Sequence, residues 1–240
     1  MMPTVAVLAG GRATRLGALA ADTAKSLIDV NGRPFAVHQL ARLEQQGLTD
    51  VVFLVGHLGP QIEAALGGGT PPMRIRYAFD GPRPLGTGGA IRQALPLLTD
   101  PFMVLYGDSY LECDFNAVHD THRAGGRHGL MTVYRNDDRL DRSNVQYSGG
   151  AILRYDKQDR TPDMRHIDYG LGVLSHAAFD ARRAGEVFDL ADVYQDLVAA
   201  GQLAGYEVTS RFYEIGSPEG LGDLRSHLAS TATPAEGTTH

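Results

Sequence analysis

Apolar and polar positions follow two alternating patterns along the first half of the chain. Short, continuous apolar runs, which are typical of strands buried on both faces, are followed by segments whose apolar residues recur at helical spacing. The runs predicted to form strands are 3–8, 50–55, 75–79 and 101–106, and the segments predicted to form helices are 35–46, 60–66 and 88–98. Strand–helix repeats of this length indicate parallel strands joined by right-handed crossovers.

The pattern changes in the second half, where strand-like segments are joined by polar turns. The segments predicted to form strands there are 129–135, 144–147, 151–155 and 165–174, and helices are expected near 190–200 and 218–228. We therefore predict an α/β fold, a Rossmann-like mixed, mostly parallel sheet flanked by helices, in a single domain over residues 1–229. No repeat is visible, so no β-helix domain is expected, and residues 230–240 are predicted to be a disordered tail.

Composition narrows the class of protein. The 240 residues, 43% of them hydrophobic, suffice for one large or two small domains. Acidic residues outnumber basic ones by 28 to 22, which argues against a general nucleic-acid binder. The single cysteine, Cys113, excludes an intramolecular disulfide and fits a reducing compartment. No signal peptide and no apolar segment long enough to span a bilayer is visible, so we expect a cytoplasmic protein without a membrane partner.

The stretch LAGGRATRLGALAADTAK, residues 8–25, directly follows the first predicted strand. Its small residues let backbone N–H groups approach a ligand closely, and Arg15 and Lys25 add cations that suit a polyphosphate. The alternative is a tight strand-to-helix turn with surface cations. The residues predicted to bind a nucleotide in this loop are Leu8, Ala9, Gly10, Gly11 and Thr14.

This loop differs from the two commonest phosphate loops, because it lacks Gly-Lys-Ser/Thr and its glycines do not have the spacing Gly-x-Gly-x-x-Gly. It resembles the signature loop of sugar-1-phosphate nucleotidylyltransferases, Gly-Gly-x-Gly-Thr-Arg-Leu followed by Pro-Lys. Residues 10–16 and 24–25 match it, except that Ala13 replaces a glycine and Ala24 replaces the proline. The resemblance spans about residues 3–228, and it implies a nucleotide half at about 1–125 and a sugar-phosphate half at about 126–229.

A second segment, Pro-Leu-Gly-Thr-Gly-Gly-Ala-Ile at 84–91, resembles the second nucleotide loop of that family. The resemblance implies that Gly86, Thr87 and Gly88 lie against the base. The alternative is a glycine-rich turn that opens a helix, with Thr87 as its cap.

Two further segments resemble the family's metal ligands. Gly107-Asp108 follows a predicted strand, as does the family's Gly-Asp, whose aspartate binds Mg²⁺. Residues 212–219 resemble Phe-x-Asp-Ile-Gly-Thr-Pro-Glu, with Glu214 in place of the second ligand, a carboxylate longer by one methylene. The resemblance implies an Mg²⁺ cofactor on Asp108 and Glu214, both hard oxygen donors. The alternatives are a turn aspartate and a glutamate that merely precedes a helix start at Ser217 and Pro218.

The sugar-phosphate half carries two weaker matches. Tyr155-Asp156-Lys157 resembles the family's aromatic-x-Glu-Lys, and the segment from Asp168 to Val173 resembles its Asn-Ala-Gly-Ile-Tyr. The resemblance implies that Asp156, Lys157, Asp168 and Gly170 bind the sugar phosphate. Asp168 in place of asparagine accepts hydrogen bonds but donates none when ionised. Taken alone, Tyr-Asp-Lys is more often a solvated strand end.

The reaction implied by the resemblance is attack of a sugar 1-phosphate on the α-phosphorus of a nucleoside triphosphate, with release of pyrophosphate and with Arg15 and Lys25 as catalytic residues. The 84–91 loop most resembles that of guanylyltransferases acting on manno-configured sugars, which implies GTP and a manno-heptose or mannose 1-phosphate as substrates. Uridylyl- and cytidylyltransferases and the molybdopterin guanylyltransferases are enzymatic alternatives. A non-catalytic nucleotide-sugar-binding subunit stays open, because Ala13, Ala24, Asp168 and Glu214 depart from the pattern. A homodimer is left open as well.

Overall fold

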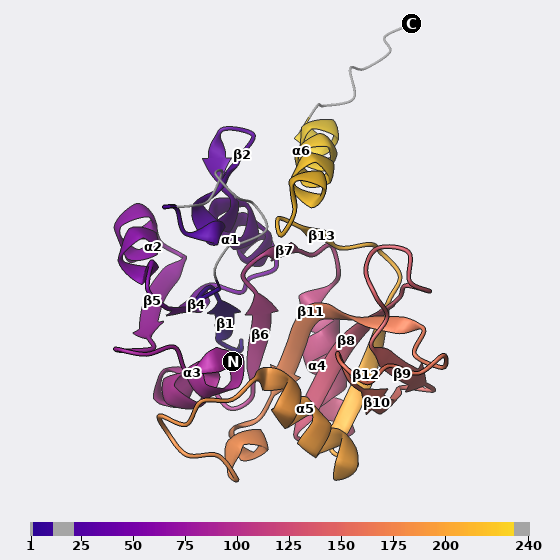
Figure 1. Cartoon of the computed structure of the whole chain (residues 1–240). Coiled ribbons are helices and arrows are strands. Elements are labelled where there is room, and N and C mark those ends of the chain that lie inside the picture. The colour runs from indigo at the N-terminus through magenta and orange to yellow at the C-terminus, as the bar shows by residue number, and fades with distance from the viewer. Residues whose placement is uncertain (1, 12–21, 233–240) are drawn as a thin grey trace, which may run out of the picture.

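The computed structural model describes residues 2–11 and 22–232, and its centre is a nine-stranded sheet (Figure 1). The strand order is β5 (Arg74–Phe79), β4 (Asp50–Val55), β1 (Val5–Leu8), β6 (Phe102–Tyr106), β11 (His166–Leu174), β8 (Gly129–Arg135), β12 (Leu203–Val208), β10 (Ala151–Tyr155) and β9 (Val145–Ser148). The strands β5-β4-β1-β6, here called the parallel half, all run the same way. The other five form the mixed half, in which β11 is antiparallel to β6 and β8 while β12 is parallel to β8. The predicted mixed α/β sheet is confirmed.

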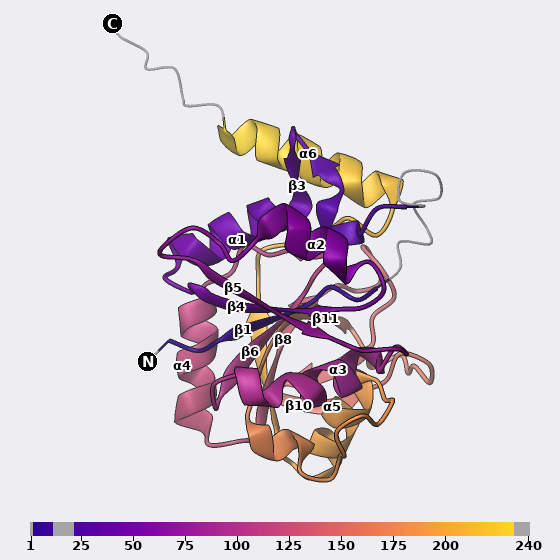
Figure 2. The ribbon, with the colours of Figure 1, turned by 90° about the vertical axis from the view of Figure 1, so that its left-hand side faces the viewer.

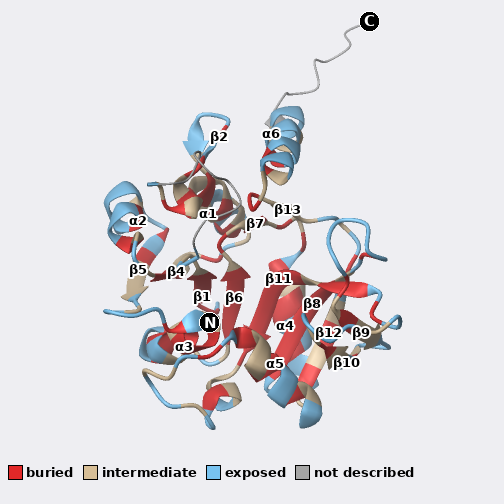
Figure 3. Ribbon diagram, viewed as in Figure 1, coloured by how far each residue is buried: buried red, intermediate tan, exposed pale blue. Residues whose placement is uncertain are grey.

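Helices cover both faces of the sheet (Figure 2). On one face, α1 (Phe35–Gln45), α2 (Gly59–Leu66) and α4 (Phe115–Gly125) share an apolar core with alternate residues of the strands. On the other face, α3 (Gly86–Ala94) and α5 (Leu190–Ala199) bury a second core. The helices bury one stripe and expose the rest, whereas the central strands are buried on both faces (Figure 3).

The sequence pattern missed α4 and β12. The helix α4 begins where the Asp114 carboxylate accepts a hydrogen bond from the Ala117 amide, and it ends at Gly126 in the left-handed conformation. Its buried face includes His119 and His122, so a search for apolar residues at helical spacing does not find it. The strand β12 contains Gly205, which breaks the apolar pattern.

Two short ribbons lie outside the main sheet: β7 (Ser109–Tyr110) pairs with β13 (Tyr213–Glu214), and β2 (Asp29–Val30) pairs with β3 (Arg33–Pro34). The last helix, α6 (Pro218–Ala232), packs against them through Leu221 and Leu224. It extends three residues into the segment predicted to be a tail, and residues 233–240 lie outside the described part of the chain. Among the described residues, three 3₁₀ turns join these elements, η2 (Lys25–Leu27), η3 (Leu95–Leu97) and η4 (His176–Phe179). Within the described ranges, no helix is long and apolar enough to cross a membrane.

Candidate active site

A cavity of about 380 Å³ opens at the carboxyl ends of the parallel half, where ligands bind in sheets of this kind. Residues from several distant segments line it. Those predicted from the sequence are Leu8, Ala9, Gly10, Gly11, Lys25, Gly86, Thr87, Asp108 and Lys157. The chain contains only two lysines, Lys25 and Lys157, and both line this cavity.

The end of β1 approaches its neighbours closely. The Ala9 amide donates to the Leu54 carbonyl at 2.9 Å, and the Gly107 amide donates to the Leu8 carbonyl at 3.1 Å. A Cβ at Gly107 would lie 2.5 Å from the Leu8 carbonyl oxygen, so only glycine fits between β1 and the end of β6. The predicted glycine loop thus begins at the cavity floor, whereas Thr14 and Arg15 lie outside the described residues.

The second glycine-rich loop packs against the segment before α5. The amides of Gly88 and Gly89 donate to the Phe188 carbonyl at 3.1 and 3.2 Å, and a Cβ at Gly88 would lie 2.4 Å from the Phe188 ring. The Thr87 hydroxyl accepts a hydrogen bond from the Leu190 amide at 2.8 Å, so it binds the first residue of α5, whose N-cap is Asp189, and does not cap α3. Gly86 and Thr87 line the cavity, while the Gly88 amide is used within the protein.

Lys25 and Asp108 form an ion pair at the cavity wall, with Nζ 2.7 Å from Oδ2. The lysine side chain is 17% exposed and the aspartate 37% exposed, so both can be reached from the cavity. The β7–β13 ribbon brings Glu214 to the same place, because the Ile215 amide donates to the Asp108 carbonyl at 3.0 Å. A Cβ built on Gly216 would lie 3.3 Å from Lys25 Nζ and 3.4 Å from Glu214 Oε2. One ammonium and two carboxylates therefore converge.

This donor set fits a magnesium ion. Mg²⁺ is commonly held in proteins by one or two carboxylates, with substrate phosphates and water completing the coordination. The Lys25 ammonium on Asp108 already marks a cation position beside that carboxylate. Among residues 2–11 and 22–232 no group of three or more histidine, cysteine or acidic side chains could hold a metal by itself. A metal on Asp108 and Glu214 would therefore depend on the phosphates of a bound nucleotide.

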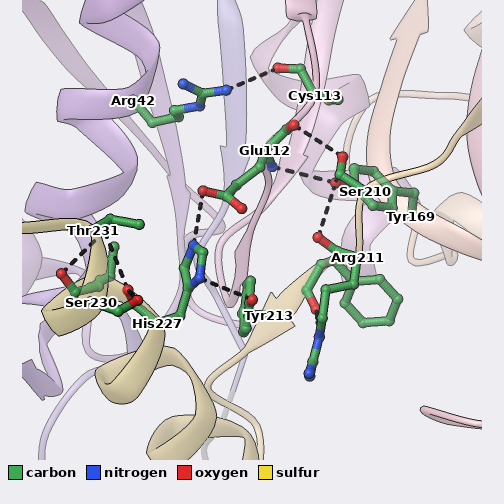
Figure 4. Close-up of polar contacts among 12 residues, drawn as sticks. Arg42, Glu112, Cys113, Tyr169, Ser210, Arg211, Tyr213, His227, Ser230 and Thr231 are labelled. Atoms are coloured by element: carbon green, nitrogen blue, oxygen red, sulfur yellow. Dashed lines mark hydrogen bonds and ion pairs between the residues drawn. The ribbon is translucent and has the colours of Figure 1, made fainter.

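A polar network behind these carboxylates ties α6 to the β7–β13 ribbon (Figure 4). His227 Nε2 lies 2.9 Å from Glu112 Oε1, and His227 Nδ1 lies 3.0 Å from the Tyr213 hydroxyl. The Tyr213 and His227 rings stack with centroids 4.3 Å apart. Because Glu112 follows β7 and Tyr213 precedes Glu214, this network supports the ribbon that carries Glu214 and that begins directly after Asp108.

The residues predicted for the sugar phosphate separate into two groups. Lys157 lines the cavity, with its ammonium 5.9 Å from the centre of the Tyr155 ring. Asp156 closes a turn by accepting the amides of Gln158 and Asp159 at 2.8 and 2.9 Å. These bonds, that from Asp159 foremost, lower the pKa of the Asp156 carboxyl.

Asp168 and Gly170 lie one layer behind the cavity wall. The Tyr106 hydroxyl donates to Asp168 Oδ2 at 2.6 Å, and the Gly170 amide donates to Asp168 Oδ1 at 3.0 Å. Burial raises the pKa of the Asp168 carboxyl, and the hydrogen bond from Tyr106 opposes that rise. Asp168 does not line the cavity itself, but it is hydrogen-bonded to Tyr106, which does.

Tyr106 and Asp80 are among the cavity residues that the sequence analysis missed. Tyr106 ends β6, where it counts as one more apolar residue of a buried strand. Asp80 follows β5 and accepts a hydrogen bond from the Leu85 amide at 3.4 Å, and burial raises the pKa of its carboxyl. Its place at the carboxyl end of a parallel strand is a signal that could have found it.

Comparisons with known proteins identify the family of this chain. Residues 5–158 match the model of the MobA-like NTP transferase domain family. The chain is 32% identical over 225 residues to N-acetylmuramate alpha-1-phosphate uridylyltransferase of Neisseria meningitidis serogroup B, covering 88% of this chain and 92% of that protein. It is 26% identical over 219 residues to the mannose-1-phosphate guanylyltransferase catalytic subunit beta of Xenopus tropicalis, covering 89% of this chain and 61% of that protein.

Solved structures share the fold. HddC from Yersinia pseudotuberculosis complexed with GMP-PN superposes with a TM-score of 0.78 at 22% identity, covering 95% of this chain and all of that one. The inositol-1-phosphate CTP transferase from T. maritima gives a TM-score of 0.77 at 20% identity, covering 97% and 98%. The chain belongs to the MobA-like NTP transferase domain family, and within it to the sugar-1-phosphate nucleotidyltransferases.

Proposed function

We propose that this protein transfers a guanylyl group from GTP to a manno-configured sugar 1-phosphate, mannose or manno-heptose, and releases pyrophosphate with the aid of Mg²⁺. The observation that carries the proposal is the position of the two lysines of the chain. A chain with 22 basic residues contains two lysines, and both lie in one cavity with Asp108 and the glycine loop. Lysine is a compact point charge well suited to phosphate, so this placement fits a site for two phosphorylated substrates.

The chemistry follows from the arrangement. An oxygen of the sugar phosphate forms a bond to the α-phosphorus as the bond from that phosphorus to the pyrophosphate oxygen breaks. The attacking group is already an anion, so no general base is needed, and the site must align two anions and offset their repulsion. Lys157 holds the sugar phosphate, while Lys25 and Arg15 hold the triphosphate and the leaving pyrophosphate. Asp108 and Glu214 would hold Mg²⁺, which would neutralise charge on the reacting phosphates.

Guanine is favoured by Asp80, the carboxylate beside the 84–87 loop. Guanine presents two adjacent donors on its pairing edge, N1–H and the N2 amino group, which match the two oxygens of a carboxylate. Uracil presents one N–H between two carbonyl oxygens, and these oxygens repel a carboxylate. The relatives named mannose-1-phosphate guanylyltransferase and the GMP-PN complex of HddC point the same way. A uridylyltransferase is the second candidate, because the Neisseria relative matches along nearly its whole length.

The test is pyrophosphate release by the purified chain with Mg²⁺, using GTP, UTP, CTP, ATP and dTTP in combination with several sugar 1-phosphates. We expect the highest kcat/KM for GTP with mannose or manno-heptose 1-phosphate. Higher efficiency with UTP would make the protein a uridylyltransferase, and no release with any pair would make it a binding subunit. Asp80→Asn, which exchanges one acceptor for a donor, should lower the GTP preference more than it lowers turnover.

The two lysines allow an independent test of binding. An amine-reactive reagent modifies Lys25, Lys157 and the N-terminal amine, and peptide mapping separates the three products. GTP with Mg²⁺ should protect Lys25, and mannose 1-phosphate should protect Lys157. Equal labelling with and without both ligands would show that this cavity is not the substrate site.

A further inference from the structure

Tyr106 and Asp168 form a buried pair beside the cavity. Tyr106 lines the cavity, and its hydroxyl donates to Asp168 Oδ2 at 2.6 Å. The Tyr155 hydroxyl approaches the same oxygen at 3.5 Å, and Asp168 Oδ1 accepts the Gly170 amide at 3.0 Å. The carboxylate is therefore held in one orientation by donors on three sides.

The backbone is shaped to present this carboxylate. The pairing of β11 with β8 shifts between Asp168 and Gly172, and Gly170 within the shift has a φ of 98°. A Cβ at Gly170 would lie 3.3 Å from the Ser109 hydroxyl. Irregularities of this kind redirect a side chain and often lie next to active sites. The direction of Asp168 toward Tyr106 is thus fixed by the fold.

The hydrogen bond decides what Tyr106 can offer to a ligand. A phenol has one hydrogen to donate, and that of Tyr106 is committed to Asp168. The lone pairs of the Tyr106 oxygen remain to accept a hydrogen bond from a ligand, backed by the charge of a carboxylate one hydrogen bond away. An asparagine at position 168 would carry no charge and would add an amino donor. This part of the wall therefore accepts hydrogen bonds and disfavours anions.

Lys157 places the sugar next to this wall. Lys157 lies over the Tyr155 ring, and Tyr155 reaches Asp168. A phosphate bound by Lys157 brings the sugar attached to it close to Tyr106. We propose that the Tyr106–Asp168 pair sets the sugar class: it takes 1-phosphates whose sugar is uncharged and offers a free hydroxyl, and it rejects sugars that carry a carboxylate. This inference rests on the proposed function, because it assigns Lys157 to the sugar phosphate.

The test uses two ligands that differ by one group, α-D-mannose 1-phosphate and α-D-mannuronate 1-phosphate, in which a carboxylate replaces the C6 hydroxymethyl. The proteins are wild type, Asp168→Asn, Tyr106→Phe and the control Tyr194→Phe, which removes a hydroxyl beside Gly172 in the same buried region. Binding by calorimetry and KM are measured for each, with the KM for GTP as reference. We expect wild type to prefer mannose 1-phosphate at least tenfold.

Asp168→Asn should cut that preference severalfold by improving binding of the mannuronate ligand. Tyr106→Phe should raise the KM for mannose 1-phosphate and leave that for GTP unchanged, and the Tyr194→Phe control should keep both values. Equal binding of the two ligands by wild type, or an unchanged preference in Asp168→Asn, would overturn the proposal. Failure of the proposed function looks different: either another triphosphate would release pyrophosphate more efficiently than GTP, or none would release it, and calorimetry would still decide the sugar preference in both cases.

Discussion

The parallel and mixed halves of the sheet contribute to the cavity in different ways. The parallel half contributes closely packed backbone at Gly10, Gly107 and the 86–89 loop, together with the charged side chains of Lys25, Asp80 and Asp108. The mixed half contributes side chains, Lys157 in the cavity and Tyr155 and Asp168 behind it. Tyr106, at the end of β6, joins the two. Backbone sites need small residues in consecutive positions, whereas side-chain sites need partners that are far apart in the sequence.

The largest effect is expected at Asp108, on the boundary between the halves. Asp108→Asn keeps the shape but removes the charge that faces Lys25 and, in the proposed site, Mg²⁺. Turnover at saturating Mg²⁺ should fall by about a hundredfold to a thousandfold, the usual cost of losing one group that stabilises charge in the transition state. The melting temperature serves as the check on folding. Asp163→Asn, an exposed change of the same kind, is the control. Near-normal turnover in Asp108→Asn would reduce Asp108 to a turn residue.

The second prediction tests whether the parallel half depends on its backbone. Gly107→Ala places a methyl 2.5 Å from the Leu8 carbonyl oxygen. We expect a loss of about 3 kcal/mol in unfolding free energy, as for overpacked cores, together with weaker GTP binding. In Gly125→Ala the added methyl meets nothing within 4 Å, so stability should hold or rise. If denaturant unfolding gives the same free energy of unfolding for both variants, the close approach of β1 and β6 is not the reason for glycine at position 107.

A third prediction concerns Glu214, which the β13 ribbon brings beside Asp108. Glu214→Gln keeps the length and removes the charge, so the Mg²⁺ concentration for half-maximal turnover should rise about tenfold or more. Thermal stability without metal should change little. Glu219→Gln, an exposed change five residues away, should leave the Mg²⁺ titration alone. Superimposable titrations for wild type and Glu214→Gln would remove Glu214 from the metal site.

The smallest effect lies in the mixed half, away from the cavity. Burial lowers the pKa of the His122 imidazole in α4, so the folded protein binds that proton less readily than the unfolded chain does. Its contribution to stability is complete above the unfolded pKa of about 6.5 and is lost as the pH falls through the lower folded value. When the pH is lowered from 7.5 to 5.5, the melting temperature of His122→Leu should fall by about 2–4 °C less than that of wild type. A larger loss in the variant would contradict this.

The same contrast explains what the sequence could predict. The strands and helices of the parallel half appear in the hydrophobic pattern within a few residues, and the glycine motifs that line the cavity are consecutive. The helix α4 was missed because histidines occupy part of its buried face. The link from Tyr106 to Asp168 joins residues 62 positions apart and depends on the irregular pairing at Gly170. No local pattern carries that information. The binding roles of the site residues stay predictions.

The strand order has a consequence for how the chain is made. The strand β6 completes the parallel half, and its free edge is covered by β11, which is synthesised after β8, β9 and β10. In the nascent chain the apolar edge of β6 therefore stays uncovered while β8, β9 and β10 are translated. Such uncovered edges can pair with strands of other chains. The cavity is finished at the same late moment, because Lys157 and the partner of Tyr106 arrive with those strands. A nascent chain that stops at residue 125 has the glycine loops but lacks the strand that closes their sheet.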